Sequence, residues 1–302
     1  MKKIPVGSKV SLIANPKFPF CNSLLIEDEK VALVDSGIGV DWIKMILKEK
    51  NIDVLLNSHT HPDHITGNNF ISKVTSAEIY VPEQEQGYTR SLEKMKKGLG
   101  VRGRAIEPAW DKIAKKILPN NKSCRELPLR EGQIFDFGKI RLEAIYTPGH
   151  SPGHFCFFLQ DEDLLFVSDL GLDSFGPWYG YLNSELGDYL STIKKIKKMG
   201  IKRGLASHYG GVIDDLDKGL DRCLKIVDRR ENRIVELLKN GPKDVDELAQ
   251  CKIIYNNIDE LQFPYDAFIL FFEKNMIKQH LGLLMDSGKV KKEGRHYSLF
   301  SS

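Results

Sequence analysis

The sequence has little of what membrane spans, disulfide frameworks and secretion signals require. No apolar stretch among its 302 residues approaches the length of about 18 that a membrane-spanning helix needs. The five cysteines are an odd number without C-x-x-C spacing, so we expect reduced thiols and neither a disulfide framework nor a cysteine zinc knuckle. The early apolar segment SLIANP is too short for a signal-peptide core. These absences predict a cytoplasmic protein without membrane contact.

Internal repeats and low-complexity segments are also absent from the sequence. Apolar residues make up 41% of the chain and charged residues 28%, which is typical of a folded globular protein. Its length suits one large domain, or a domain of about 200 residues followed by a smaller one.

The net charge of +3 conceals an uneven distribution along the chain. Residues 84–130 contain 12 Lys/Arg and five Asp/Glu, a net charge of +7, so the remaining chain has a net charge of −4. A local excess of this size can attract an anionic partner. A solvated helical surface explains it equally well, and the sequence leaves both explanations open.

The first 212 residues alternate between β-type and helical patterns. KVSLIANP, NSLLIED, KVALVDSG, AEIYVP, IRLEAIYTP, HFCFFLQ and LLFVSDL predict strands, and VDWIKMILKEK and LGDYLSTIKKIKKM predict amphipathic helices. Residues 84–130 predict two helices joined by a glycine-bearing turn. We therefore expect an α/β domain over residues 1–212 with a basic helical insert at 84–130.

From residue 213 the pattern becomes mostly helical. Three helical segments follow one another, the first ending at Gly241-Pro242, and KVKKEGRHYSLF then predicts a hairpin that turns at Glu293-Gly294. The order of three helices and a hairpin resembles a winged helix, so residues 213–302 are predicted to form a second, winged-helix-like module. We expect His280 and His296 in this module to be packing or surface residues.

The densest chemical signal is HTHPDH at residues 59–64, which holds three of the chain's eight histidines. In an extended segment His59 and His61 point the same way, while the proline turn lets Asp63 and His64 point in another direction. Two sets of donors aimed at two points suit a pair of adjacent metal ions. Imidazole and carboxylate ligands favour zinc, iron or manganese over calcium.

This segment resembles the HxHxDH signature of the metallo-β-lactamase superfamily. Later motifs occur in the matching order: TPGHSPGH contains His150, FVSDLG contains Asp169 and LASHYGG contains His208. The resemblance covers roughly residues 8–212 and implies an αββα sandwich. Together with the C-terminal module, the chain is similar to the beta-lactamase-like-2 group.

The resemblance also implies a role for each donor. The first metal ion is expected at His59, His61 and His150, the second at Asp63, His64 and His208, with Asp169 bridging the two. A hydroxide shared by the metal ions is the implied nucleophile, and Asp63 is the implied catalytic residue that positions it and accepts its proton. A bound divalent metal can lower the pKa of water to about 7.

Two histidines depart from the simplest pattern. His208 lies in Ser-His-Tyr-Gly, where the family usually has Pro-Gly-His-Gly. His154 follows His150 by four residues, and since the seven donor positions are already filled, we expect it to orient ligands or to pack.

We therefore expect a dinuclear metal-dependent hydrolase, with zinc as the first choice and iron or manganese as alternatives, acting on an ester, thioester or phosphodiester. Aspartate at position 169 is similar to the glyoxalase II, thioesterase, lactonase and nuclease branches, so we do not expect a true β-lactamase. Near the cleft, basic residues of the insert would favour a small anionic substrate: Arg90, Lys94, Lys96, Lys97, Arg102 and Arg104. The aromatic residues Trp178, Tyr179 and Tyr181 either wall a substrate pocket or pack within a loop.

Alternatives of other classes stay open. The same ligand set serves iron-containing redox enzymes of this fold, although the chain shows no flavin-binding signature. A nucleic-acid-binding protein using the C-terminal module is a further alternative, since winged helices often bind DNA. We favour a module that completes the substrate cleft or mediates oligomerisation.

Overall fold

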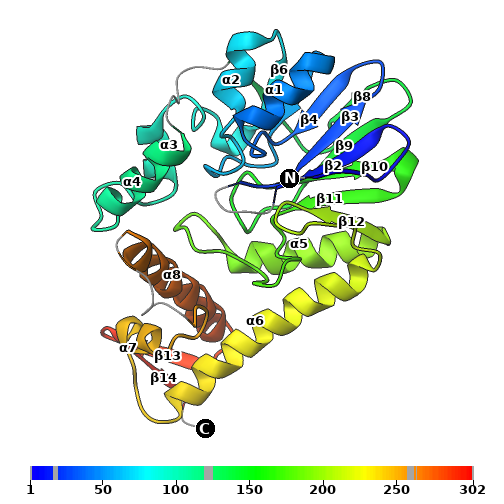
Figure 1. Cartoon of the computed structure of the whole chain (residues 1–302). Helices are drawn as coiled ribbons and strands as arrows, with labels where there is room; N and C mark the ends of the chain where they lie inside the picture. Colours follow the sequence, from blue (N-terminus) through cyan, green and yellow to red (C-terminus); the bar gives the residue numbers. More distant parts are fainter. Residues whose placement is uncertain (1, 16–19, 119–124, 257–261, 263, 301–302) are drawn as a thin grey trace.

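Two β-sheets pack face to face in the N-terminal two thirds of the chain (Figure 1). The computed structural model describes residues 2–15, 20–118, 125–256, 262 and 264–300. The first sheet has the order β1 (Lys2–Pro5), β2 (Val10–Ala14), β3 (Ser23–Glu27), β4 (Val31–Val34), β5 (Val54–Leu56), β6 (Glu78–Pro82) and β7 (Glu126–Leu129). The second has the order β12 (Arg203–Ala206), β11 (Leu164–Ser168), β10 (Phe155–Leu159), β9 (Arg141–Tyr146) and β8 (Ile134–Asp136).

Alternation of side chains along the strands builds the layers. In β3, Leu24 and Ile26 pack in the core between the sheets, whereas Leu25 packs on the outer side. In β10, Phe157 faces the same inner core and Cys156 faces outward. Because both faces of these strands are buried, helices must cover the outer ones.

Helices cover both outer faces and complete the expected αββα arrangement. On the first sheet lie α1 (Val40–Glu49) and α2 (Asn68–Val74), with Ile43 and Ile71 buried against it. On the second lie α5 (Leu186–Met199) and the start of α6 (Leu216–Leu238), with Ile193 and Leu220 buried. A short 3-10 helix, η2 (Gln160–Glu162), links β10 to β11.

The strand directions bring several strand ends to one edge. β4, β5, β6 and β7 pair in parallel, and β11 pairs in parallel with β12 in the other sheet. The residues that follow β4 and β5 therefore leave at the same edge of the first sheet, and those that follow β11 and β12 leave at the same edge of the second. Polar side chains placed there can meet without crossing the core.

The insert differs from expectation at its end. After η1 (Glu83–Glu85) it contains the two expected helices, α3 (Leu92–Gly98) and α4 (Glu107–Ile117). Residues 126–129, however, form β7, the edge strand beside β6. The segment ELPL has only four residues and contains a proline, which disfavours a strand, and its pairing depends on β6, which is distant in sequence.

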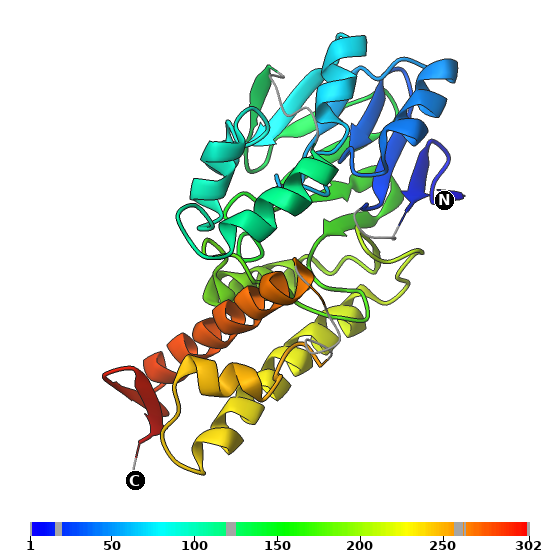
Figure 2. The same ribbon diagram turned by 60° about the vertical axis from the view of Figure 1, so that its left-hand side comes forward.

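The C-terminal segment contains the expected elements in the expected order. The long helix α6 leaves the second sheet and is followed by α7 (Val245–Gln250), α8 (Tyr265–Asp286) and an antiparallel hairpin of β13 (Val290–Glu293) and β14 (His296–Leu299). Asp244 and Glu247 form a reciprocal cap at the start of α7. The helix α8 begins beside α4 of the insert and runs away from it toward the hairpin (Figures 1 and 2).

Two further expectations concern the state of the cysteines and the presence of a membrane-spanning helix. Cys21, Cys156, Cys223 and Cys251 are free thiols, and Cys124 lies outside the described residues. Within the described ranges, none of the helices is both long and apolar enough to traverse a lipid bilayer.

Candidate metal centre

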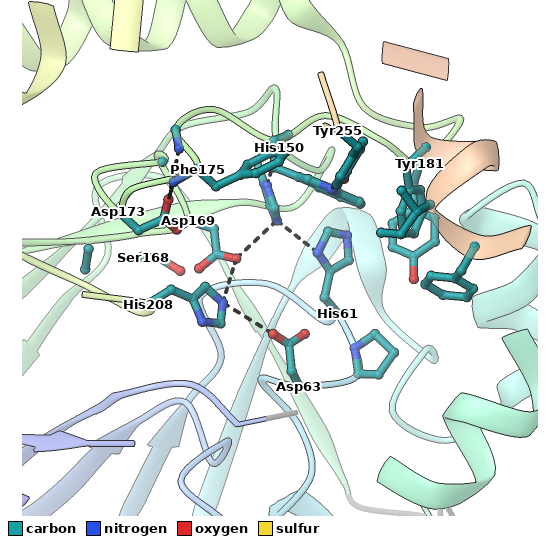
Figure 3. Close-up of a pocket in the computed structure, with 18 of the residues that line it drawn as sticks. His61, Asp63, His150, Ser168, Asp169, Asp173, Phe175, Tyr181, His208 and Tyr255 are labelled. Atoms are coloured by element: carbon teal, nitrogen blue, oxygen red, sulfur yellow. Dashed lines mark hydrogen bonds and ion pairs between the residues drawn. The ribbon is translucent and has the colours of Figure 1, made fainter. Parts of the chain in front are cut away.

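The seven expected donors lie close together in the loops that follow strands β5, β9, β11 and β12. Residues 59–64 follow β5, His150 follows β9, Asp169 follows β11 and His208 follows β12. Figure 3 shows Asp169 between His150 and His208, with His61 and Asp63 facing it. The structure therefore brings together all the residues that the sequence motifs singled out as metal ligands.

Three histidines form the first cluster. The Nε2 atom of His150 lies 3.2 Å from Nε2 of His59 and 2.9 Å from Nδ1 of His61, and all three side chains are buried. Nitrogen ligands about 2.0–2.1 Å from one tetrahedral zinc ion lie about 3.3–3.4 Å apart. The spacing of these nitrogens therefore suits one shared ion.

Asp63, His64 and His208 form the second cluster. One Asp63 oxygen, Oδ2, lies 3.7 Å from Nε2 of His64 and 3.4 Å from Nε2 of His208. The Ser-His-Tyr-Gly context of His208 thus still delivers its ring to the cluster. A carboxylate and two imidazoles at these separations are a second possible ligand set.

Asp169 lies between the two clusters. Its Oδ2 atom is 3.6 Å from Nε2 of His150 and 3.4 Å from Nε2 of His208, and its Oδ1 atom is 3.4 Å from Nε2 of His64. One carboxylate therefore faces ligands of both sets, as a bridging group must.

Buried polar atoms at the candidate centre lack hydrogen-bond partners in the described part of the chain, as expected of atoms that bind a metal ion. Nε2 of His64 and Oδ1 of Asp169 have no hydrogen-bond partner among the described residues. Leaving such a buried atom unsatisfied costs about 1–3 kcal/mol, and a coordinated cation would satisfy both atoms. Although burial raises the pKa of Asp169, the nearby His64 and His208 hold that pKa well below its usual value, so the carboxylate is ionised and ready to coordinate.

Asp35 is a functional residue that the sequence motifs did not single out. Its Oδ2 atom accepts a hydrogen bond of 2.9 Å from Nδ1 of His64 and one of 2.7 Å from the Ser58 hydroxyl, while Oδ1 accepts from the Ser58 backbone N–H. A carboxylate behind a histidine fixes the ring so that its other nitrogen points to the metal. Asp35 follows β4 directly and has φ of 60°, a conformation that non-glycine residues adopt sparingly. Its place after an apolar strand parallel to β5 is the signal that would have found it.

His150 and His154 are oriented by the chain itself. Nδ1 of His150 donates to the Trp178 carbonyl at 2.9 Å, which leaves Nε2 free to face the centre. Nδ1 of His154 donates to the Thr147 carbonyl, and its Nε2 accepts the backbone N–H of Asp169 at 3.1 Å. Burial, reinforced by His150, lowers the pKa of His154 to about 3, so the ring is neutral. His154 therefore positions the Asp169 backbone.

A cavity of about 640 Å³ adjoins the donors. Its lining includes Trp178 and Tyr181, whereas Tyr179 is buried elsewhere and contacts Arg230 and His280. Two of the three aromatic residues named as pocket candidates are thus in the pocket wall.

The basic residues of the insert do not line this cavity. Lys96 pairs with Glu93, Glu107 and Asp111, and Arg102 pairs with two of these acids. Within the described part of the chain, the cavity lining contains neither Lys nor Arg. The positive charges of the described residues in 84–130 therefore lie outside the cavity wall, and Lys96 and Arg102 are ion-paired within the insert.

Comparisons with curated proteins find relatives over part of the chain. The lactamase-like protein aptB of Emericella nidulans is 28% identical over 211 residues, which are 68% of this chain and 54% of that protein. The atrochrysone carboxyl ACP thioesterase of Aspergillus fumigatus is 31% identical over 112 residues, 36% of this chain and 33% of that enzyme. The chain thus spans about half the length of aptB, and less of the thioesterase.

Solved structures show the same fold over nearly the whole chain. A metallo-beta-lactamase family protein from Thermus thermophilus has a TM-score of 0.76 and 22% identity, covering 98% of this chain and all of that one. A beta-lactamase domain protein from Burkholderia ambifaria has a TM-score of 0.74 and 17% identity, covering 99% and 93%. The model of the metallo-beta-lactamase superfamily matches residues 16–208, the part that holds all seven donors. This chain belongs to the metallo-β-lactamase superfamily.

Proposed function

We propose that the protein is a metal-dependent hydrolase of carboxylic esters or thioesters that uses two divalent ions. The donors would be His59, His61 and His150 for one ion and Asp63, His64 and His208 for the other, with Asp169 shared. The observation that carries the proposal is the position of the Asp169 carboxylate between two sets of donors, with buried atoms that lack hydrogen-bond partners among the described residues. Zinc, iron and manganese all suit this ligand set.

Divalent ions held there would lower the pKa of a water molecule and polarise a scissile carbonyl. Asp63 lies at the boundary between the donors and the cavity. Burial raises the pKa of Asp63, but His64 and His208 outweigh this effect and hold it at about 2. Its carboxylate is thus ionised at neutral pH, and we propose that it orients the attacking water and accepts its proton.

Two findings support an acyl substrate over a phosphodiester. Phosphoryl groups are usually held by Arg or Lys, and in the described part of the chain the cavity lining has neither. One relative is named as a thioesterase. Because position 169 is aspartate, we do not expect β-lactam hydrolysis.

The position of α8 supports a role for the C-terminal segment in completing the cleft. Four residues of α8 line the cavity next to the donors: Tyr265, Phe268, Ile269 and Phe272. We propose that residues 1–212 form the catalytic domain and that residues 213–302 form a winged-helix-like module whose helix α8 closes one side of it. The position of α8 favours this role over nucleic-acid binding.

The test combines metal analysis with a substrate screen on the full chain. We expect stoichiometric transition metal by mass spectrometry, and chelator-sensitive hydrolysis of esters or thioesters exceeding that of bis(p-nitrophenyl) phosphate. Anaerobic purification with optical and electron-spin-resonance spectra would detect iron, since zinc is silent in both. A well-folded preparation that neither contains nor takes up transition metal would contradict the proposal.

A further inference from the structure

We propose that the cavity beside the metal centre is a subsite for a bulky apolar group attached to the scissile ester or thioester. This inference deepens the proposed function and rests on it for the reaction. The cavity volume, about 640 Å³, lies within the range of about 300–1,000 Å³ typical of small-molecule sites. It adjoins His61, Asp63, His150, Asp169 and His208, so a group bound there lies next to the reacting atoms.

One wall of the subsite is an apolar stripe on α8. The residues Tyr265, Phe268, Ile269 and Phe272 are spaced by three or four positions, so they lie along one face of the helix. Phe268 and Phe272 pack edge to face with ring centroids 4.7 Å apart. The stripe faces the cavity next to α4, whose Ile113 also lines it.

The wall that adjoins this stripe comes from the loop after β11. Trp178 packs edge to face against Tyr181 and Phe272, with ring centroids 5.3 and 4.8 Å apart. Nε1 of Trp178 donates to the Tyr255 hydroxyl at 2.7 Å, so the indole N–H is already satisfied. The Tyr181 hydroxyl likewise accepts from Nε1 of Trp110. These aromatic groups therefore present apolar ring surface to a ligand.

The loop that carries Trp178 is held in place from α6. The Arg230 guanidinium donates to the Pro177 and Phe175 carbonyls and lies 5.2 Å from the centre of the Phe175 ring. Since Arg230 is buried, this contact fixes the loop from behind. The wall is thus preformed, which reduces the ordering cost of binding.

The charges around the cavity exclude an anionic group from its apolar part. The described lining residues include three carboxylates, Asp63, Asp169 and Asp173, and no Lys or Arg. Two of the carboxylates belong to the metal centre, and Asp173 accepts the backbone N–H groups of Phe175 and Gly176. A phosphate or carboxylate placed against α8 would meet no positive partner there. Any anionic part of the substrate must therefore lie outside the subsite.

The test uses two substrate series and a matched pair of variants in the full, metal-loaded chain. Ethyl esters of acids with two to ten carbons vary the acyl side, and acetates of alcohols of the same lengths vary the alcohol side. Burying one methylene is worth about fourfold, so we expect kcat/KM to rise about threefold to fourfold per methylene in one series until the cavity is full. The series that responds shows which side of the ester enters the subsite.

Ile269→Lys places a cation on the stripe and should lower the ratio of long-chain to short-chain kcat/KM by about tenfold or more. Leu270→Lys puts the same charge one residue along α8. Leu270 is an exposed residue outside the cavity lining, so its variant should keep the wild-type ratio. Binding of methyl ketones of increasing length, measured by calorimetry, provides a readout that needs no hydrolysis.

The outcomes separate the subsite from the reaction. Ketone affinity that rises with chain length in wild type and Leu270→Lys, and flattens in Ile269→Lys, supports the subsite even if no ester is cleaved. In that case only the proposed hydrolase function fails. Hydrolysis with no dependence on chain length in either series, together with ketone binding unaffected by length, would overturn the subsite.

Discussion

His64 donates from Nδ1 to the carboxylate of Asp35 at 2.9 Å, and both side chains are fully buried. The same carboxylate accepts the Ser58 hydroxyl and backbone N–H. The ring of His64 is thus fixed in one tautomer, with Nε2 directed at Asp63 and Asp169. Asp35 contributes no ligand to the proposed centre, yet it determines how one ligand is presented.

Replacing Asp35 by Asn tests this relationship. The amide keeps the size of the side chain but weakens the acceptor that holds the Nδ1 proton of His64. We expect metal affinity and turnover to fall about 10–100-fold, as is usual when the partner behind a metal ligand is altered. Metal titration and kcat/KM measure both effects. Asp41→Asn, at an exposed position on α1, is the control and should change neither.

His154 provides a second test of positioning. Its Nε2 accepts the Asp169 backbone N–H, and removal of the ring leaves that N–H without this acceptor. For His154→Ala we expect about a 10–100-fold loss of activity, a milder effect than removal of a ligand. Turnover with a normal circular dichroism spectrum would agree with this role. Complete loss of metal would instead make His154 a ligand.

Substitution of Gly149 tests how closely the backbone next to His150 packs against α5. A Cβ built on Gly149 would lie 2.4 Å from the backbone N and Cα of Tyr189, and φ there is +130°. Neither neighbour can move cheaply, so Gly149→Ala should lower the free energy of unfolding by about 2 kcal/mol or more.

Gly187→Ala is the matched control for this substitution. Gly187 lies in α5, and an added Cβ meets no atom within 4 Å. Alanine favours a helix over glycine by up to about 1 kcal/mol. Denaturant unfolding should therefore show this variant to be as stable as wild type or slightly more stable. Equal destabilisation by both substitutions would contradict the steric role of Gly149.

The dependence of stability on pH tests whether the buried His280 stays neutral in the folded protein. Burial, aided by Arg230, lowers its pKa to about 3, and its Nε2 is 2.8 Å from the Tyr179 hydroxyl. His280 takes up a proton near pH 6.5 in the unfolded chain but stays neutral in the folded chain. Its contribution to the free energy of unfolding is therefore lost as the pH falls below 6.5 toward 3. Between neutral pH and pH 5.5, one such histidine lowers the free energy of unfolding by about 1 kcal/mol.

Comparison with His280→Gln isolates this contribution from those of the other buried histidines. The loss of unfolding free energy between pH 7.5 and 5.5 should be smaller in the variant by about 1 kcal/mol. Urea unfolding at both values measures it. An identical loss in the two proteins would mean that His280 is protonated in the folded state.

The residues that meet at the candidate centre could be singled out from the sequence because they follow strands in dense, spaced motifs. His59, His61, Asp63 and His64 occur within six residues, and Asp169 and His208 each follow an apolar strand. Asp35 escapes the same reasoning because it is a single acid without a motif, and its importance depends on the parallel pairing of β4 with β5.

The pocket wall depends on contacts between segments far apart in sequence. The apolar stripe on α8 has a helical pattern, but an ordinary core helix has the same pattern, and only its position beside α4 and Trp178 makes it a pocket wall. The insert shows the converse. Its excess positive charge suggests a cationic cleft, yet none of its Lys or Arg residues is among the described residues that line the cavity. The net charge of a segment does not show where its charged side chains lie relative to the cavity.

Asp169→Asn is the decisive substitution for a carboxylate shared by two metal ions. The variant keeps the shape of the side chain but removes the negative charge, and it leaves one good ligand oxygen where a bridge needs two. Metal content and ester or thioester turnover, measured alongside circular dichroism, decide the outcome. We expect loss of at least one metal ion and of nearly all hydrolysis, with the fold retained. Retention of two metal ions and full activity would contradict the bridging role, and Asp169 would then be a structural residue.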